Sequence, residues 1–225
     1  MMNDPKISAA DRMLEAAGPL FADRPFDAVS TREIAKAADV NLSAISYHFD
    51  NKEGLYRAIF EKIVADLKPI RVSFGLFLHT KMGAAGDDRA ALAQIVVKFV
   101  SDLLDSVMSP DNPRWRMRLM TREIQQPTEC FDIVMNGHIN VMHDLIGILV
   151  AKSLEEPEGS DNVRLVTHSI LIMALQYALN ETLVKARLGW TDIGPVEIIK
   201  IKNSLTLMIL RILNLEAHSD TGLEG

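Results

Sequence analysis

Residues 26–55 of the chain read FDAVSTREIAKAADVNLSAISYHFDNKEGL, and this stretch decides the fold. Ser30 and Glu33 have the spacing of a capping box, in which the serine oxygen accepts from the third helical amide and the glutamate reaches back to the serine amide. A short helix is therefore expected after Ser30. The apolar spacing predicts a second short helix over residues 42–49, after a turn at residues 39–41.

Two short helices joined by a tight turn, after a longer amphipathic helix over residues 9–23, are the arrangement of trihelical DNA-binding domains. In the second short helix the small and polar positions are predicted to face outward and the apolar positions inward. The outward set is Asn41, Ser43, Ala44, Ser46 and Tyr47, and the inward set is Leu42, Ile45 and Phe49. Trihelical modules also occur in proteins that never touch DNA, so the pattern alone leaves DNA binding open.

The rest of the chain also has helical periodicity. Asn51 is placed to cap a long helix from Lys52 onward, which Pro69 is expected to kink or end, and residues 75–88 are expected to form a flexible connection. Further helices are predicted over residues 89–108, 114–125, 127–154, 162–188 and 195–214, with a break at 109–113. No run alternates as strands do. We therefore expect an all-α fold, with a three-helix helix-turn-helix domain at residues 1–55 and a C-terminal helical bundle for ligand binding and dimerisation at 56–225.

The composition fits a globular protein, since 48% of the 225 residues are hydrophobic and 24% are charged. The single cysteine, Cys130, and the lack of a basic-then-apolar leader predict a cytoplasmic protein. The longest stretch without charged residues, between Arg164 and Glu181, falls short of the roughly 20 apolar residues that span a bilayer, so no membrane span is expected. The net charge of −6 argues mildly against nucleic acid as a partner, and acids outnumber bases even within the first 57 residues. DNA binding must therefore depend on where the charges lie.

The order of residues over about 9–60 resembles the signature of the TetR family of transcriptional regulators. Tyr47, Phe49 and Lys52 match its hallmark Tyr-x-Phe and the lysine that follows. One departure is Asp39, where the family commonly has glycine in the turn. Aspartate tolerates left-handed backbone angles better than most residues, so we expect the turn to survive.

The resemblance implies a dimeric regulator, by family expectation a repressor. The dimer would bind a pseudo-palindromic double-stranded operator, and a small-molecule effector would release it from this DNA. Thr31 at a helix start would bind phosphate, helped by Arg32. Asn41, Ser43 and Ala44 would face the major groove and set the sequence preference. The backbone phosphates would be contacted by Tyr47, His48 and Lys52.

Simpler interpretations remain for these residues. Tyr47 alone is explained as well by packing against the first helix, and Lys52 by a solvated surface charge. The acidic balance of the N-terminal segment also leaves a second function open, that of a helical dimeric adaptor with the same fold that no longer binds DNA.

The last two predicted helices are apolar on most sides, which indicates burial on more than one side. We expect a homodimer through these two helices, although packing under the preceding helices of a monomer would also bury them. Such a dimer would set two recognition helices about one DNA turn apart.

Residues 114–128 look like a segment found in the CecR-like subgroup of the TetR family. Several arginines there are candidates to hold an anionic effector, or else to form surface ion pairs. An apolar effector pocket with a few polar positions is predicted from Phe99, Leu103, Trp115, Leu119, Met120, Arg122, Phe131, Met135, Met142, Met173, Gln176, Tyr177 and Asn180. The same apolar positions are also typical of a protein core. Gln176 and Asn180 interrupt an apolar helix, so a ligand or a cross-dimer hydrogen bond should satisfy them.

Catalytic motifs are lacking. There is no His-Glu-x-x-His, no paired cysteines, no phosphate-binding glycine loop and no nucleophile elbow. His138 and His143 are five residues apart, which places them on different sides of a helix. We therefore expect no enzyme activity, no metal site and no cofactor.

Overall fold

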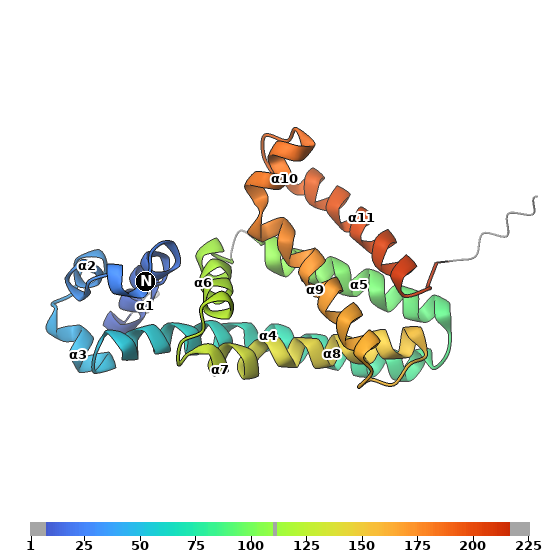
Figure 1. Cartoon of the computed structure of the whole chain (residues 1–225), viewed down its shortest axis with the longest axis horizontal. Coiled ribbons are helices and arrows are strands. Elements are labelled where there is room, and N and C mark those ends of the chain that lie inside the picture. The colour runs from blue at the N-terminus through green and yellow to red at the C-terminus, as the bar shows by residue number, and fades with distance from the viewer. Residues whose placement is uncertain (1–7, 110–111, 217–225) are drawn as a thin grey trace, which may run out of the picture. The chain divides into compact units, whose positions relative to one another are not determined.

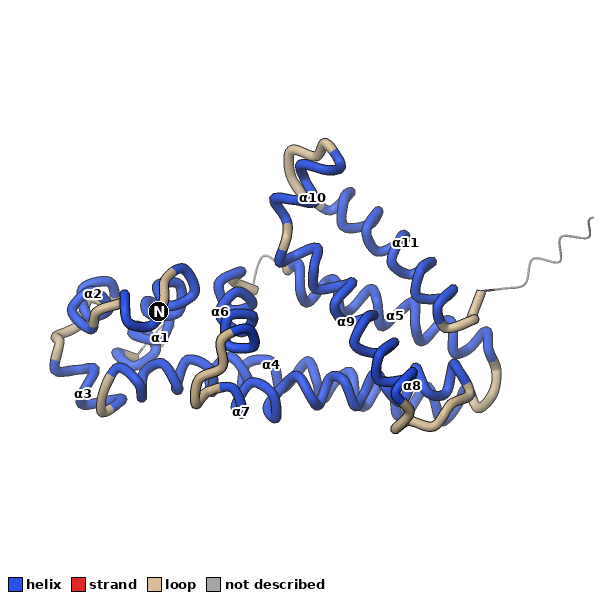
Figure 2. Tube along the Cα trace, in the orientation of Figure 1, coloured by secondary structure: helices blue, strands red, loops and turns tan. Residues whose placement is uncertain are grey.

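The computed structural model describes residues 8–109 and 112–216, and within these residues all regular structure is helical (Figures 1 and 2). The N-terminal helices are α1 (Ala9–Asp23), α2 (Thr31–Ala37), α3 (Ser43–Phe49) and α4 (Lys52–Ala85), with a 3₁₀ turn at Phe26–Ala28. The following ones are α5 (Arg89–Met108), α6 (Arg114–Gln125), α7 (Phe131–Val134) and α8 (Asn140–Leu154). The last are α9 (Asp161–Leu179), α10 (Glu181–Leu188) and α11 (Pro195–Ile212). The all-α prediction is confirmed.

Two compact units make up the chain. Unit 1 comprises residues 1–69 and 113–139, and unit 2 comprises residues 70–112 and 140–225. The expected boundary at residue 55 was drawn where the helix-turn-helix pattern ends. By packing, residues 56–69 and 113–139 belong with the N-terminal helices.

The core of unit 1 is built on one face of α1. Met13, Ala17 and Phe21 are fully or almost fully buried there, and Ile34 of α2 and Ile45 of α3 join them. This is the helix-turn-helix pattern of the sequence realised as a trihelical domain. Leu119 of α6 is also fully buried in the same cluster, so α6 is part of this core.

The predicted helix starts are largely confirmed. The Ser30 hydroxyl accepts from the Glu33 amide at 3.2 Å, and Asn51 Oδ1 accepts from the Gly54 amide at 2.7 Å. The second half of the predicted capping box is different, because the Glu33 carboxylate binds the guanidinium of Arg24 at 2.7 Å. An ion pair between α2 and the end of α1 therefore takes the place of the contact with the Ser30 amide.

The expected end of α4 is wrong. The helix continues through Pro69 and over most of the expected connection at residues 75–88, to Ala85. Proline removes one backbone donor, but buried side chains before it (Ile63) and after it (Phe74, Leu78) hold the helix by packing. The helix ends only at Gly86, whose φ of +54° favours glycine, and Asp88 then caps α5.

Two other predicted helices are divided in the structure. The one expected from Pro127 begins at Phe131 and contains a π-helical turn, Met135–Ile139, before α8. The helix expected over residues 162–188 is interrupted at Asn180, which is the C-cap of α9 and the N-cap of α10. Asn180 is thus explained by a helix break. Of the predicted break at 109–113, residues 110 and 111 lie outside the described residues.

The run Phe131–Leu154 is long and apolar enough to cross a membrane by length and composition alone. Its most buried side chains pack in the protein core instead. Val134 belongs to the core of unit 1, and Ile146, Leu149 and Val150 are buried in unit 2.

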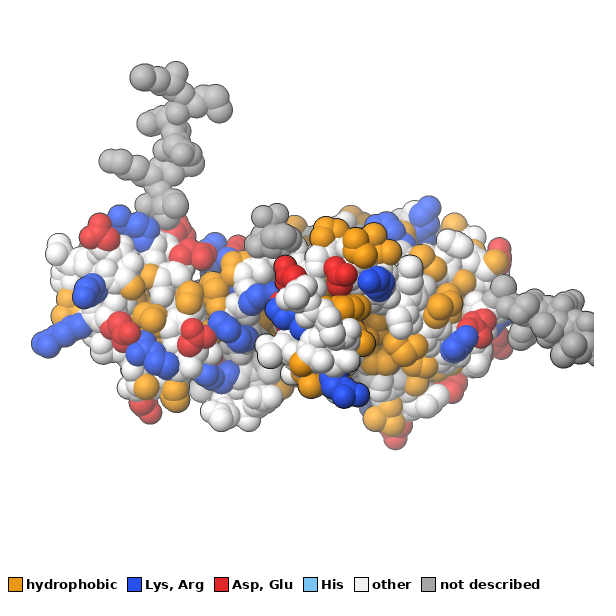
Figure 3. Space-filling view, turned by 90° about the horizontal axis from the view of Figure 1, so that it is seen from above, with side chains coloured by type: hydrophobic (Ala, Val, Ile, Leu, Met, Phe, Trp, Pro, Cys, Tyr) orange, Lys and Arg blue, Asp and Glu red, His pale blue; other side chains and the backbone are white. Residues whose placement is uncertain are grey.

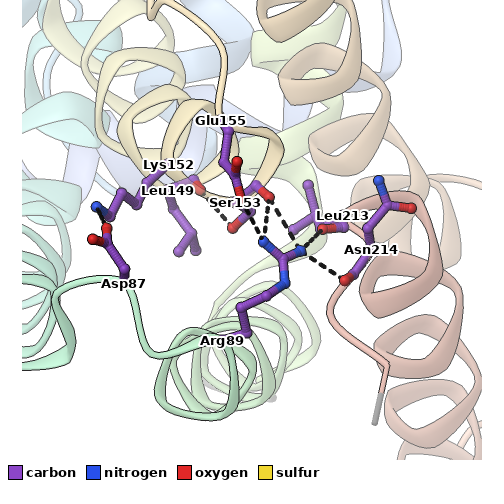
Figure 4. A network of polar contacts seen from close by, with 8 residues as sticks. All are labelled: Asp87, Arg89, Leu149, Lys152, Ser153, Glu155, Leu213 and Asn214. Carbon is purple, nitrogen blue, oxygen red and sulfur yellow. Dashed lines mark hydrogen bonds and ion pairs between the residues drawn. The ribbon is translucent and has the colours of Figure 1, made fainter. Parts of the chain in front are cut away.

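In unit 2, α5 packs against α8, α9 and α11, and one arginine joins the ends of three of these helices (Figure 4). The Arg89 guanidinium, at the start of α5, donates to the Asn214 carbonyl at 2.7 Å and to the Ser153 and Leu213 carbonyls at 3.4 Å. It also pairs with Glu155 at 3.2 Å. A cation is favoured at these positions, because the last carbonyls of a helix lack helical partners and carry partial negative charge.

We predict that Arg89→Ala lowers the free energy of unfolding by about 1–2 kcal/mol, because the carbonyls at the ends of α8 and α11 lose a charged donor. Thermal unfolding followed by circular dichroism measures this. Lys98→Ala is the matched control, since Lys98 forms an exposed pair with Asp102 one turn away and lies 6.0 Å from the centre of the Phe77 ring, and contacts of both kinds contribute little at the surface. Equal melting temperatures for the two variants would contradict the role of Arg89.

Candidate DNA-binding interface

The turn between α2 and α3 depends on a left-handed residue. Asp39 has φ of +51°, and the Val40 amide after it donates to the Ala35 carbonyl at 3.0 Å. The expectation that aspartate supports this turn in place of glycine is therefore confirmed. The residues that follow the turn at the start of α3, Asn41, Leu42 and Ser43, are exposed.

An open groove runs over the surface of α1, α2 and α3. Its lining contains four of the predicted DNA-contacting residues, namely Asn41, Ser43, Ala44 and Tyr47. It also contains two basic residues that the sequence analysis missed, Arg12 of α1 and Lys36 of α2, which are both exposed. No sequence signal placed Arg12 here, because the contact between α1 and α3 is tertiary.

The side chain of Tyr47 is 84% exposed, which excludes the simpler interpretation that it packs against the first helix. Its ring contacts the exposed His48 edge to face, with centroids 4.8 Å apart. An exposed phenol beside an imidazole at the end of a short helix is available for hydrogen bonds to phosphate oxygens.

Leu42 was predicted to face inward, and this is wrong. It is 46% exposed at the N-cap of α3, whereas Ile45 is buried and Phe49 is half-buried. Helix α3 begins at Ser43, one residue later than expected, and Leu42 stands at its N-cap, still with helical backbone angles (φ −55°, ψ −38°). Ile45 is therefore the main residue by which α3 packs into the core.

Lys52 has structural partners. Its half-buried ammonium donates to the carbonyls of Phe26 at 2.9 Å and Val29 at 3.0 Å, and it lies 4.1 Å from the centre of the Phe26 ring. It therefore holds the turn that leads into α2. An ammonium has three donors, so a phosphate contact would use the remaining one.

Thr31 is the first residue of α2 and Arg32 follows it as an exposed cation. The amides of the first turn of a helix carry partial positive charge. Both positions are thus compatible with the anion contact that the resemblance implies.

Ion pairs with arginines of α6 neutralise several acids of unit 1. Glu15 and Asp66 bind Arg116 at 3.3 and 3.1 Å, and Asp23 binds Arg118 at 2.8 Å. The arginines come from α6, far along the chain. The excess of acids in the N-terminal sequence is therefore offset by bases that fold back onto it, while Arg12, Arg32 and Lys36 stay exposed.

The contacts of α6 favour ion pairs over an effector site for its arginines. The Arg122 guanidinium donates to the carbonyls of Phe21 and Arg24 at the end of α1. The Trp115 ring covers Gly18, where a Cβ atom would come within 2.4 Å of it. Trp115, Leu119, Met120 and Arg122, four of the predicted pocket residues, thus pack on α1 or its core cluster.

The other predicted pocket residues are divided between the units. Phe131 and Met135 are half-buried in unit 1. In unit 2, Phe99 and Met142 are buried, Gln176 and Asn180 are exposed, and the half-buried residues are Leu103, Met173 and Tyr177.

The buried carboxylate of Glu123 holds the segment after α6 in place by hydrogen bonds. Glu123 accepts from the Thr128 amide at 2.7 Å, from the Thr128 hydroxyl at 2.8 Å and from the Tyr56 hydroxyl at 3.3 Å. Burial and then the Glu123 charge raise the pKa of Tyr56 above its ordinary value. Burial also raises the pKa of Cys130 to about 11, so its thiol is a poor nucleophile.

We predict that Arg12→Ala and Lys36→Ala each weaken binding to all DNA sequences alike and reduce the slope of log affinity against log salt by about 1. The reason is that each substitution removes one cation from the groove. Fluorescence anisotropy over a range of salt concentrations measures the slope.

The matched control is Lys62→Ala, which removes the same charge from the Lys62–Asp66 pair on α4. Slopes for the two groove variants equal to that of the control would contradict the contact assignment.

Comparison with known proteins adds independent findings. A model of the C-terminal domain of the HTH-type transcriptional dual regulator CecR matches residues 92–214, and a model of the bacterial regulatory proteins of the tetR family matches residues 13–59. The HTH-type transcriptional dual regulator CecR of Shigella flexneri is 26% identical over 222 residues, which cover 94% of this chain and 96% of that protein.

The probable HTH-type transcriptional regulator YttP of Bacillus subtilis strain 168 is 50% identical over 50 residues, which are 22% of this chain and 24% of that protein. A solved structure, that of AibR in complex with isovaleryl coenzyme A and operator DNA, has a TM-score of 0.59 and 17% identity. The match covers 90% of this chain and 98% of that one. The structural likeness shows a shared fold.

Proposed function

Because the chain belongs to the TetR family of DNA-binding transcriptional regulators and carries the CecR-type C-terminal domain, we propose that it is a one-component switch. As a homodimer it binds a pseudo-palindromic operator and represses transcription in the cytoplasm by excluding polymerase. A small-molecule effector that binds the C-terminal helices lowers operator affinity, by the difference in its affinities for the two states.

The observation that carries this proposal is the groove on α1, α2 and α3. It combines the exposed phenol of Tyr47 with small polar groups at the start of α3 and with the cations Arg12 and Lys36. Small polar side chains at the N-terminal end of a recognition helix reach base edges, whereas the cations and Tyr47 contact phosphates. In this proposal Asn41, Ser43 and Ala44 set sequence preference, and Thr31, Arg32, Tyr47, His48 and Lys52 contact the backbone.

Exposed apolar stripes on the C-terminal helices support the homodimer. Leu165 and Ile172 lie seven residues apart on α9, and Val196, Ile199 and Leu207 lie at helical spacing on α11; all five are exposed. Figure 3 shows hydrophobic side chains gathered over the C-terminal helices. Large exposed apolar patches are typical of interaction sites.

The proposed effector site lies among the C-terminal helices. The apolar residues Phe99 and Met142, with the half-buried Met173 and Tyr177, supply adaptable surface inside unit 2. AibR, which shares the fold, is described in complex with both an acyl coenzyme A and operator DNA. We propose the same arrangement for this chain, in which one protein binds both a small-molecule ligand and an operator.

We predict tight, salt-sensitive binding to the intergenic DNA upstream of the protein's own gene and weaker binding to unrelated DNA of equal length. Tyr47→Ala should weaken both, whereas Ser43→Asn should change the ranking of operator variants by about 1–3 kcal/mol for a base pair in contact. Fluorescence anisotropy with a panel of single-base operator variants measures both effects.

Before the measurement, any effector that copurified with the protein is removed by extraction. Binding to neither fragment at low salt would sink the proposed function and favour an adaptor of the same fold.

The dimer prediction is separate. Ile199→Glu places a charge in the apolar stripe of α11 and should shift the protein from dimer to monomer, because an unpaired charge is costly to bury. Leu76→Glu is the control, since Leu76 of α4 is 64% exposed and Ile199 is 57% exposed, but Leu76 lies outside the α9 and α11 stripes. Light scattering after size exclusion gives the mass. A dimeric Ile199→Glu variant would place the interface elsewhere.

A further inference from the structure

Glu123 of α6 is a fully buried carboxylate that does not line the groove on α1, α2 and α3. Its two oxygen atoms have different partners. Oε1 accepts from the amide and the hydroxyl of Thr128 at 2.7 and 2.8 Å, and Oε2 accepts from the Tyr56 hydroxyl at 3.3 Å. Burial and then the Glu123 charge raise the pKa of Tyr56, so its hydroxyl keeps its proton and donates. The carboxylate therefore joins the segment after α6 to α4 near its start.

Tyr56 and Lys52, one turn apart on α4, both contact Phe26. The Tyr56 ring lies edge to face on the Phe26 ring, with centroids 5.1 Å apart. The Lys52 ammonium lies 4.1 Å from the centre of the same ring and donates to the carbonyls of Phe26 and Val29 at 2.9 and 3.0 Å. Residues four apart on a helix are neighbours on one face. The two side chains therefore hold one turn of the chain together.

The positions of Phe26 and Val29 fix the direction of the Lys52 ammonium. Two of its three N–H groups are used by the two carbonyls, and the tetrahedral nitrogen then leaves one direction for the third. A hydrogen bond weakens steeply as its angle falls, so a small shift of the turn would point the third donor away from a phosphate oxygen. Tyr56 restrains this shift through the Phe26 ring, and Glu123 restrains Tyr56.

The end of α6 also holds the turn at its beginning. Arg122, the residue before Glu123, donates to the carbonyls of Phe21 and Arg24, which come just before the turn. Two consecutive residues of α6 thus act on the same short segment. The sequence analysis missed Glu123 and Tyr56 because they lie 67 residues apart and meet only through tertiary packing.

We propose that Glu123 and Tyr56 are positioning residues for operator binding, which act by orienting the Lys52 ammonium toward a backbone phosphate. This inference rests on the proposed operator binding. Neither positioning residue touches DNA, since Tyr56 is 7% exposed and Glu123 is fully buried. The end of α6 is thereby a place where a change of conformation alters operator affinity without the loss of a DNA contact of its own.

The test is the salt dependence of operator binding by the full-length protein. Tyr56→Phe removes a neutral hydroxyl group and keeps the ring, so by itself it takes no cation from the interface. We expect it to weaken operator binding about 3- to 10-fold. The slope of log affinity against log salt should fall by up to about 1, because the Lys52 contact is lost. Ser153→Ala, which removes a buried, hydrogen-bonded hydroxyl from unit 2, is the matched control and should leave both values unchanged.

A double-mutant cycle separates positioning from a general loss of stability. Lys52→Met removes the charge and keeps an unbranched side chain over the Phe26 ring. Because Tyr56 acts through Lys52, adding Tyr56→Phe to Lys52→Met should lower neither the affinity nor the slope further.

Glu123→Gln is a second variant that tests the other end of the contact. It leaves one acceptor oxygen, which the two Thr128 donors hold, so Tyr56 loses its acceptor and the slope should fall although a negative charge is removed. With operator binding by the wild type intact, a wild-type slope in Tyr56→Phe, or an undiminished effect of Tyr56→Phe beside Lys52→Met, would overturn this proposal alone. Failure of the wild type to bind operator would overturn the operator-binding function as well.

Discussion

The N-terminal unit depends on how the apolar face of α1 is covered. Met13, Ala17 and Phe21 would be in water if α1 stood alone, and α2, α3 and α6 together enclose them. Each buried side chain of this size contributes about 1.5–3 kcal/mol relative to exposure. Since α3 is only seven residues long, it is too short to be stable alone and depends on this shared core.

The same dependence explains the position of α6. Its Leu119 enters the core around α1, and its Arg122 satisfies carbonyl oxygens at the end of α1 that no helical amide reaches. A guanidinium suits this position because it is a fixed cation with several donors in one plane. The arginines of α6 thus stabilise α1 in two ways. They donate to the carbonyls at its C-terminal end, and they neutralise its acids.

Much of the fold could be predicted because helix starts are local. Ser30 and Asn51 act through amides three residues away, so sequence spacing is enough to find them. Pro69 was misjudged because its effect is decided by packing before and after it. Leu42 was misjudged because it stands at the N-cap of α3, and whether a side chain at the end of a helix is covered depends on the elements packed around it, which the pattern does not give.

For the candidate site, too, the sequence predicts what is local and misses what depends on tertiary packing. Tyr47, Asn41 and Ser43 lie on one short element, and their outward direction follows from its period. Arg12 shares their groove only because α1 packs on α3. Arginines in α6 were ambiguous for the same reason, because a guanidinium pairs equally well with an effector and with an acid of the chain itself.

Helix α9 has apolar residues both on its buried side and on its exposed side. Val163, Thr167, Ile170 and Ala174 are buried and serve the core of unit 2, whereas Leu165 and Ile172 are exposed. A helix that is apolar on both sides would gain nothing from the second stripe in a monomer, since exposed leucine and isoleucine contribute no burial there. The second stripe gains burial only where another surface covers it, which is what the proposed homodimer would supply.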